Sequence, residues 1–259
     1  MDSLTITRYS IPVKGVAKKT ICHFSDIHLT AYDALSTPEE KEKALQDTQG
    51  WMDTRRFFAE KYGYPTGAAQ MADSRDQYAR LLALANTTDA AVITGDIMNQ
   101  VTPADLRATE AGLAALQVPF IAVCGNHESP EELPDGMRLS VMKEPVSVVD
   151  LGDIQIVGIN NHRRVITPEQ LTRLETLLST EKPTVVAFHI PLLTPGNRDA
   201  VYGCGEYFRM NEYEGCPAEN DRFRELISAS PVVAVLTGHL HFPCISALST
   251  SVSSSRWHK

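Results

Sequence analysis

The chain has 259 residues, of which 43% are hydrophobic and 22% are charged. This composition is typical of a folded globular protein and excludes a largely disordered chain. We expect a single α/β domain over residues 1–259. The formal net charge of −8 opposes the binding of polyanions, so a long nucleic acid is not expected as a partner.

The sequence carries no sign of export or membrane insertion. Charged and polar residues interrupt the apolar runs near the N-terminus before they could form a signal peptide, and no segment is apolar over the length of a bilayer. The five cysteines lack CxxC spacing, so neither a disulfide framework nor a thiolate zinc site is indicated. We therefore expect a cytoplasmic protein that does not bind membranes.

Short β-branched runs alternate along the chain with helix-like stretches, which predicts layered α/β architecture. Two helices are predicted to begin at the pairs Thr102–Pro103 and Thr167–Pro168, because a capping threonine followed by proline is typical of a helix start. In chain order the predicted elements are strands 5–11 and 20–26, helices 38–60 and 70–85, strand 90–96, helix 103–116, strands 119–127, 147–152 and 154–160, helix 168–178, strand 184–190, helix 220–228 and strand 232–239.

Five of the predicted strands end in polar residues that bind cations, in the sequences SDIH, TGD, CGNH, FHIP and TGHLH. Ligands of open α/β sheets gather at the carboxyl ends of the strands. Asp26 and His28 are two residues apart, as are His239 and His241, so each pair projects to one side of an extended chain. The donors are nitrogen and oxygen without thiolates, which favours divalent Mn, Fe, Zn, Co or Ni.

Each of these signals is weak when taken alone. A single histidine at the end of an apolar strand, such as His189, is more often a hydrogen-bonded core residue than a ligand. A lone Gly-Asp pair is usually a turn. The glycines before Asp96, Asn126 and His239 predict tight turns in which the backbone approaches a ligand closely.

The full set in this order is specific: DxH at Asp26, GD at Gly95, GNHE at Gly125, a strand-end His189 and GHxH at Gly238. It resembles the calcineurin-like metallophosphoesterase superfamily, and its spacing is similar to the bacterial branch that includes class III cyclic-nucleotide phosphodiesterases. The resemblance implies a four-layer α/β/β/α sandwich with two mixed sheets. It also implies two metal ions, one bound by Asp26, His28 and His241, the other by Asn126, His189 and His239, and both by Asp96.

The resemblance also implies a reaction. Two metal ions about 3.5–4 Å apart can generate hydroxide from a bridging water and neutralise the oxygens of an in-line phosphoryl displacement. The expected function is hydrolysis of a small phosphoester, a phosphodiester such as a cyclic nucleotide or a phosphomonoester. The alternatives are a broad metabolite or nucleotide phosphatase and, less favoured because every ligand position is filled, a non-catalytic scaffold on the same fold.

Two further residues are candidate catalytic groups. His127 resembles the family histidine that contacts the phosphate and helps the leaving group depart. Asn99 stands where many members have an aspartate that orients this histidine, and an uncharged amide would stabilise a protonated His127 less. A capped turn before the helix at Pro103 is an equally good interpretation of Asn99.

Two long segments flank these motifs. Residues 32–74 are charged, predicted to be largely helical, and interpreted as an insertion that covers one side of the site. Residues 192–218 are rich in Gly, Pro, Asn and Tyr and are predicted to form an active-site loop. Tyr202, Tyr207 and Phe208 in this loop could stack on a base or aromatic leaving group, although simple packing is the commoner role of such residues.

Overall fold

The computed structural model describes residues 6–63, 73–194, 196–204, 210, 217–229, 231–241 and 244–246. Its strands form two sheets, of order β1-β2-β3 and β4-β5-β6-β7. The α/β architecture with two sheets is confirmed, but only the second sheet is mixed, since the three strands of the first are all parallel. The strands are β1 Ile21–Phe24, β2 Ala90–Thr94, β3 Phe120–Val123, β4 Val146–Asp150, β5 Gln155–Ile159, β6 Thr184–Ala187 and β7 Val232–Leu236.

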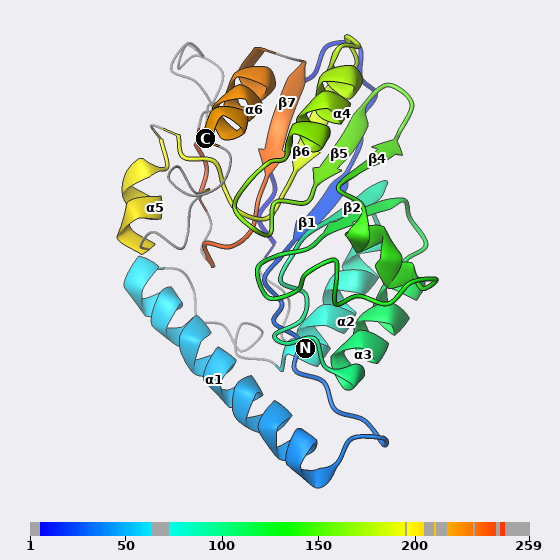
Figure 1. Cartoon of the computed structure of the whole chain (residues 1–259), viewed down its shortest axis with the longest axis vertical. Coiled ribbons are helices and arrows are strands. Elements are labelled where there is room, and N and C mark those ends of the chain that lie inside the picture. The colour runs from blue at the N-terminus through cyan, green and yellow to red at the C-terminus, as the bar shows by residue number, and fades with distance from the viewer. Residues whose placement is uncertain are drawn as a thin grey trace.

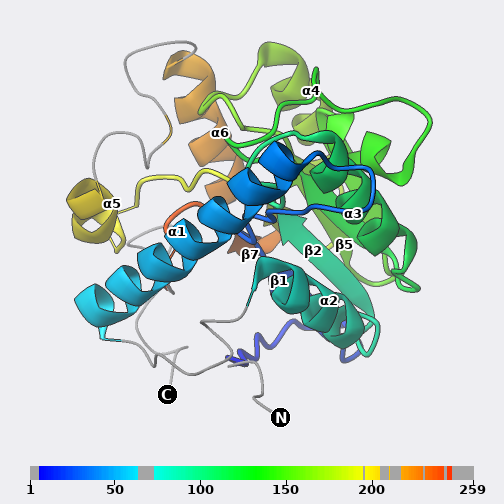
Figure 2. The same cartoon turned by 90° about the horizontal axis from the view of Figure 1, so that it is seen from below.

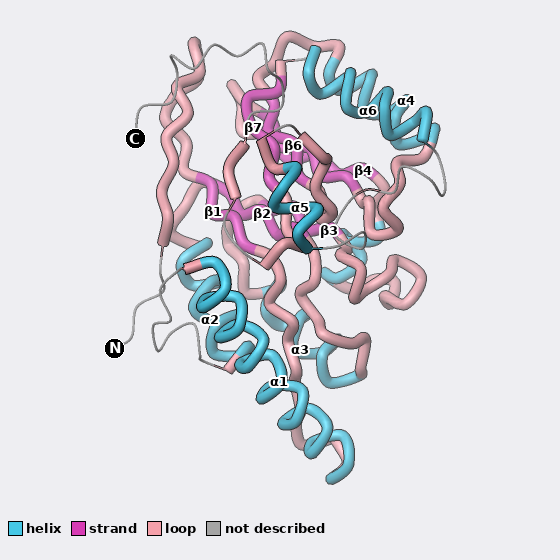
Figure 3. Tube along the Cα trace, turned by 90° about the vertical axis from the view of Figure 1, so that its left-hand side faces the viewer, coloured by secondary structure: helices cyan, strands magenta, loops and turns pink. Residues whose placement is uncertain are grey.

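Helices cover the outer face of each sheet, which gives four layers (Figure 3). Helices α2, Ser74–Ala85, and α3, Pro103–Ala114, pack on the first sheet through an apolar cluster that includes Leu82, Ile93 and Leu113. Helices α4, Pro168–Leu178, and α6, Pro217–Ala229, pack on the second sheet. The outer layers therefore bury one face of each sheet.

The inner faces of the two sheets pack against each other. Val92 and Ile121 of the first sheet share a fully buried cluster with Ile156 and Val185 of the second. The contact is close enough that a Cβ on Gly158 would clash with the Ile121 side chain. Burial of these branched side chains, at about 25 cal/mol per Å² of apolar surface, holds the two sheets together.

Helix starts follow the cap-then-proline pattern predicted from the sequence. Thr102 accepts a hydrogen bond from the main-chain N–H of Asp105, and Thr167 forms a reciprocal capping box with Gln170. Such caps contribute about 1 kcal/mol each. The two predicted helix starts are confirmed.

Helix α1, Pro38–Tyr62, lies outside the four layers. Thr37 caps it in a box with Glu40, and Gly63 ends it in the left-handed conformation. Figure 1 shows α1 running along one edge of the molecule, and Figure 2 shows it crossing in front of β1 and β7. The helix therefore lies across the strand ends rather than on a sheet face.

Three segments differ from the sequence prediction. The run at 5–11 was expected to be a strand, but residues 6–11 have no regular structure and lie exposed. A short helix, α5 Arg198–Cys204, occupies part of the expected loop 192–218, and a 3₁₀ helix, η2 Arg138–Lys143, precedes β4. Among the described residues, none of the helices is long and apolar enough to cross a membrane.

Candidate metal centre

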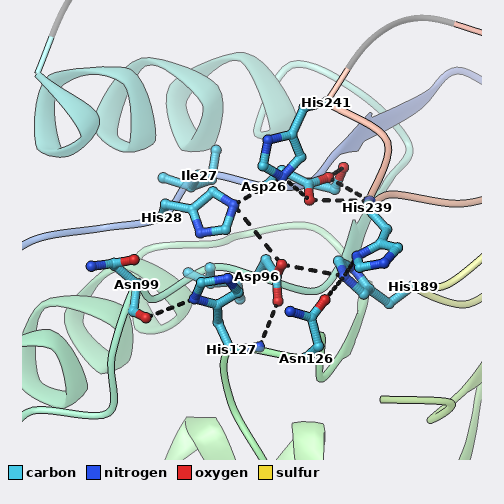
Figure 4. Close-up of polar contacts among 12 residues, drawn as sticks. Asp26, Ile27, His28, Asp96, Asn99, Asn126, His127, His189, His239 and His241 are labelled. Atoms are coloured by element: carbon cyan, nitrogen blue, oxygen red, sulfur yellow. Dashed lines mark hydrogen bonds and ion pairs between the residues drawn. The ribbon is translucent and has the colours of Figure 1, made fainter. Parts of the chain in front are cut away.

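The loops that follow β1 and β2 run side by side beyond the ends of the strands. The main-chain N–H of His28 donates to the carbonyl of Asp96 at 3.0 Å, and that of Leu29 donates to Ile97 at 2.7 Å. The parallel pairing of the sheet thus continues into the loops. It brings the side chains of Asp26 and His28 next to Asp96 (Figure 4).

The predicted ligands adopt a backbone conformation that side chains disfavour. Among the described residues six non-glycine residues have positive φ, and five of them are predicted ligands. Such conformations cost about 1–3 kcal/mol each and gather at functional sites, where the surrounding structure imposes them. The five are Asp26 at 55°, His28 at 47°, Asp96 at 50°, His239 at 72° and His241 at 58°.

Glycines give the ligands room, as the sequence predicted. A Cβ on Gly125 would overlap the carboxylate of Asp96 and lie 2.5 Å from its main-chain nitrogen. A Cβ on Gly238 would lie 2.7 Å from Oδ2 of Asp26. Any side chain at these positions would displace a carboxylate from the site.

The first group of converging donors contains Asp26, His28, Asp96 and His241, with ligand atoms within 4.8 Å of one another. Nε2 of His28 lies 3.2 Å from Nε2 of His241 and 3.9 Å from Oδ2 of Asp96. Nε2 of His241 lies 3.2 Å from Oδ1 of Asp26. Two imidazoles and two carboxylates therefore face one point.

The second group contains Asp96, His189 and His239, and Asn126 joins it through its amide oxygen. Nε2 of His189 is 3.1 Å from Oδ1 of Asn126, 3.2 Å from Nδ1 of His239 and 3.3 Å from Oδ2 of Asp96. Asp96 belongs to both groups. The structure thus brings together all seven residues that were expected to bind metal.

The donor spacing fits a cation. Tetrahedral ligands at 2.0–2.1 Å from a metal would be separated by about 3.3 Å, close to the 3.2 Å between His189 and His239 and between His28 and His241. Lone pairs at this distance repel unless a proton or a cation lies between them. Imidazole, carboxylate and amide oxygen are also ligands that borderline divalent metals accept.

The site concentrates charge in a buried setting. Burial alone would raise the pKa of Asp96, but the charge and hydrogen bond of His189 hold it well below its ordinary value. Burial likewise opposes the charged form of His189, but the carboxylate of Asp96 raises the pKa of His189 to about 9. Burial holds the pKa of His28 well below its ordinary value. The carboxylate of Asp96 is thus kept in its charged form, which is the form that binds a metal ion.

Hydrogen bonds with residues outside the donor group orient His189. Its Nδ1 lies 2.6 Å from the carbonyl oxygen of Thr94, which can only accept, so Nδ1 carries the proton and Nε2 points to the other donors. Oδ1 of Asn161 accepts the main-chain N–H groups of His189 and Ile190, both at 3.0 Å. Asn161 was not among the predicted site residues. Its position at the end of β5 was the available signal.

Glu128 supports the loop that carries Asp96. It is 1% exposed, and its Oε1 accepts the main-chain N–H of Ile97 at 2.7 Å. Burial, followed by the negative charge of Asp96, raises the pKa of Glu128 well above its ordinary value. No role was predicted for Glu128 from the sequence, although it lies directly after His127 in GNHE.

His127 lies at the edge of the first group, with its ring 4.5 Å from that of His28. Its main-chain N–H donates to Oδ1 of Asp96 at 2.9 Å. Its Nδ1 contacts Asn99 at 2.8 Å, but through the main-chain carbonyl rather than the amide oxygen that was expected to orient it. The amide oxygen of Asn99 instead accepts the indole N–H of Trp51 at 2.8 Å. The type of residue at position 99 therefore affects His127 less directly than its backbone does.

The expected aromatic loop enters the described structure only in part. Tyr202 lies on α5 with 44% of its surface exposed. Tyr207 and Phe208 lie outside the described residues.

Comparison with known proteins agrees with this geometry. Residues 19–243 match the family described as calcineurin-like phosphoesterase, and a search of curated proteins found no match. The matched segment contains every residue of both donor groups as well as His127. The chain belongs to the calcineurin-like phosphoesterase family and is a metal-dependent phosphoesterase.

Proposed function

We propose that the chain hydrolyses small phosphoesters at a centre of two divalent transition-metal ions. The observation that carries this proposal is that two separate donor groups share one carboxylate, that of Asp96. Seven donors exceed what one tetrahedral ion needs. One ion would be held by Asp26, His28, Asp96 and His241, and the other by Asp96, Asn126, His189 and His239.

Bound ions would supply positive charge to the phosphoryl oxygens and activate the attacking water. The protein supplies orientation and proton transfer. Nδ1 of His127 donates to the carbonyl of Asn99, so the ring can release a proton from Nε2 and remain a neutral imidazole with its proton on Nδ1. His127 would thus protonate the departing oxygen as the bond between phosphorus and that oxygen breaks.

A small substrate fits the charge of the chain. The net charge of −8 repels a long polyanion, whereas two ions at the site would attract a single phosphate group. A cyclic nucleotide is the leading substrate, in line with the spacing of the motifs. A broad phosphatase for metabolites or nucleotides is the alternative within the same reaction class.

The test combines metal analysis with a panel of substrates. Protein freed of metal by a chelator is reconstituted with Mn²⁺, assayed for bound metal, and given cyclic nucleotides, bis-p-nitrophenyl phosphate, p-nitrophenyl phosphate and nucleoside monophosphates. We expect two ions per chain and a faster turnover of diesters than of monoesters. Asp96→Ala should lose both ions and activity, while Asp221→Ala, whose side chain is 70% exposed on α6, serves as the matched control.

The outcomes separate the alternatives. Monoester turnover above diester turnover would favour the broad phosphatase. Two bound ions without turnover of any ester would favour a non-catalytic scaffold. Full activity with one ion per chain would contradict the binuclear centre.

A further inference from the structure

Helix α1 presents a tryptophan to the metal centre. The indole of Trp51 stacks on the imidazole of His28, with ring centroids 3.6 Å apart and planes inclined by 11°. The same indole lies 5.5 Å from the ring of His241 and 6.0 Å from that of His127. Trp51 therefore contacts a ligand of the first donor group directly.

No protein group in the described part of the chain pairs with the second ring nitrogen of His28. A metal-binding histidine normally donates its second ring N–H to a carbonyl, a carboxylate or a water, which fixes the ring orientation. His189 follows this rule through the carbonyl of Thr94. Nδ1 of His28, in contrast, is buried and has no hydrogen-bond partner within the described part of the chain. The rings of His127 and His241 lie at the edge of the His28 imidazole, with centroids 4.5 and 5.0 Å away, whereas the indole covers its face and so restricts rotation of the ring.

Two further residues of α1 form hydrogen bonds with residues on either side of His28. Nη2 of Arg55 donates to the carbonyl of Ile27 at 3.0 Å, and the hydroxyls of Thr48 and Thr30 lie 2.6 Å apart. Thr48, Trp51 and Arg55 are spaced by three and four residues, so they share one face of the helix. This face sets the height and angle of the indole over the imidazole.

Trp51 also contacts the residue that holds His127. Its Nε1–H donates to Oδ1 of Asn99, and Nδ2 of Asn99 donates to Asp47 of the same helix at 3.4 Å. The carbonyl of Asn99 in turn accepts from Nδ1 of His127. The helix therefore holds two parts of the site, one by stacking and one by hydrogen bonds.

We propose that Trp51 is a positioning residue that holds the His28 imidazole in the orientation needed to bind the first metal ion. The stack does for His28 what the hydrogen bond from Nδ1 does for His189. On this assignment α1 is part of the metal centre rather than only a cover over it. The inference rests on the proposed metal centre and adds to it a determinant of metal affinity that is not a ligand.

Two substitutions separate the stack from the hydrogen bond. Trp51→Phe keeps an aromatic ring over His28 but removes the N–H that reaches Asn99, whereas Trp51→Ala removes both. Phe57→Ala is the matched control, because Phe57 is an aromatic residue of the same helix and is 58% exposed. Calorimetric titration of the metal-free proteins with Mn²⁺ measures the number and affinity of the bound ions without any assay of activity.

We expect Trp51→Ala to weaken one of two Mn²⁺ sites by about 10–100-fold, the range found when the outer support of a metal ligand is removed. Trp51→Phe and Phe57→Ala should bind both ions with nearly wild-type affinity. Equal affinities in wild type and Trp51→Ala would overturn the inference and leave the metal centre intact. An equal loss in Trp51→Phe would also overturn it, because the hydrogen bond and not the stack would then be responsible.

A fluorescence measurement avoids any change at Trp51. The chain has two tryptophans, so Trp257→Phe leaves Trp51 as the only one. Its emission should change as Co²⁺ fills the site that His28 helps to form. An emission unaffected by Co²⁺ in a protein that binds two ions would contradict contact between Trp51 and the site. A wild-type protein that binds no ion would contradict the proposed function itself.

Discussion

Asp26 accepts the main-chain N–H of His239, 213 positions later in the chain, with distances of 3.0 Å to Oδ1 and 2.9 Å to Oδ2. Asp26 follows β1 of the first sheet, and His239 follows β7 of the second. One carboxylate therefore joins the loops of both sheets and also faces His241. The candidate metal centre and the link between these two loops therefore share one side chain.

This double role predicts different results for two substitutions of Asp26. Asp26→Asn and Asp26→Ala both remove the charge, so both should weaken metal binding. Only the asparagine keeps an oxygen that can accept the N–H of His239. In the metal-free protein, Asp26→Ala should therefore be less stable than Asp26→Asn by about 1–3 kcal/mol, the cost of a buried donor left without a partner. Urea unfolding with a chelator present measures the difference. Equal stabilities would mean that the hydrogen bond to His239 contributes nothing to folding.

The convergence of the candidate ligands could be predicted from sequence because all of them lie within a few residues after a strand, where β-branched runs mark the element and polar residues follow its end. Trp51 could not be found in this way. Its spacing on α1 is that of any half-buried helical residue, and its contact with His28 depends on how the helix docks. The error at residues 5–11 has a related cause, since alternation predicts a strand only where a neighbouring strand is available to pair with it.

Gly125 offers a test of how tightly the site is packed. In Gly125→Ala the new Cβ would overlap the carboxylate of Asp96, so we expect loss of metal binding and about 1–3 kcal/mol of destabilisation. Gly50 is the matched control, because a Cβ there would meet nothing within 4 Å and the residue lies inside α1. Gly50→Ala should stabilise the helix by about 0.5–1 kcal/mol. Metal analysis and urea unfolding test both variants. Normal metal content in Gly125→Ala would show that Asp96 can move without loss of the site.

We expect Asp105 to make the free energy of unfolding depend on pH, separately from any effect of the metal ligands. The residue is 3% exposed, accepts the N–H of Ala31 at 2.6 Å and accepts the hydroxyl proton of Thr102 at 2.7 Å. Burial raises the pKa of Asp105 to about 6, against the lowering effect of these hydrogen bonds. The folded protein thus holds the proton more tightly than the unfolded chain, in which the pKa is about 3.9. The stabilisation is complete below pH 4 and is lost as the pH rises through 6.

Replacement by asparagine should remove this dependence. Each pKa unit corresponds to about 1.4 kcal/mol, so the wild type should lose roughly 3 kcal/mol of stability between pH 4 and pH 7 relative to Asp105→Asn. Urea unfolding of both metal-free proteins at several pH values measures the difference, and groups common to both proteins cancel. Parallel stability curves would show that Asp105 has an ordinary pKa in the folded state.

The role of His127 can be tested by comparing esters whose leaving groups differ in basicity. If Nε2 of His127 gives its proton to the departing oxygen, its contribution grows as that oxygen becomes more basic. His127→Ala should therefore slow an alkyl ester by about 10²–10⁴-fold and slow release of p-nitrophenolate less, with metal content near that of the wild type. Asn99→Ala keeps the carbonyl that holds Nδ1, so it should preserve the difference between the two esters that the wild type shows. An equal loss for both esters in His127→Ala, with the metal retained, would instead assign His127 to stabilising charge on the phosphoryl group. Loss of metal would mean that the substitution had moved the neighbouring ligand Asn126, and His127→Gln would then take its place in the comparison.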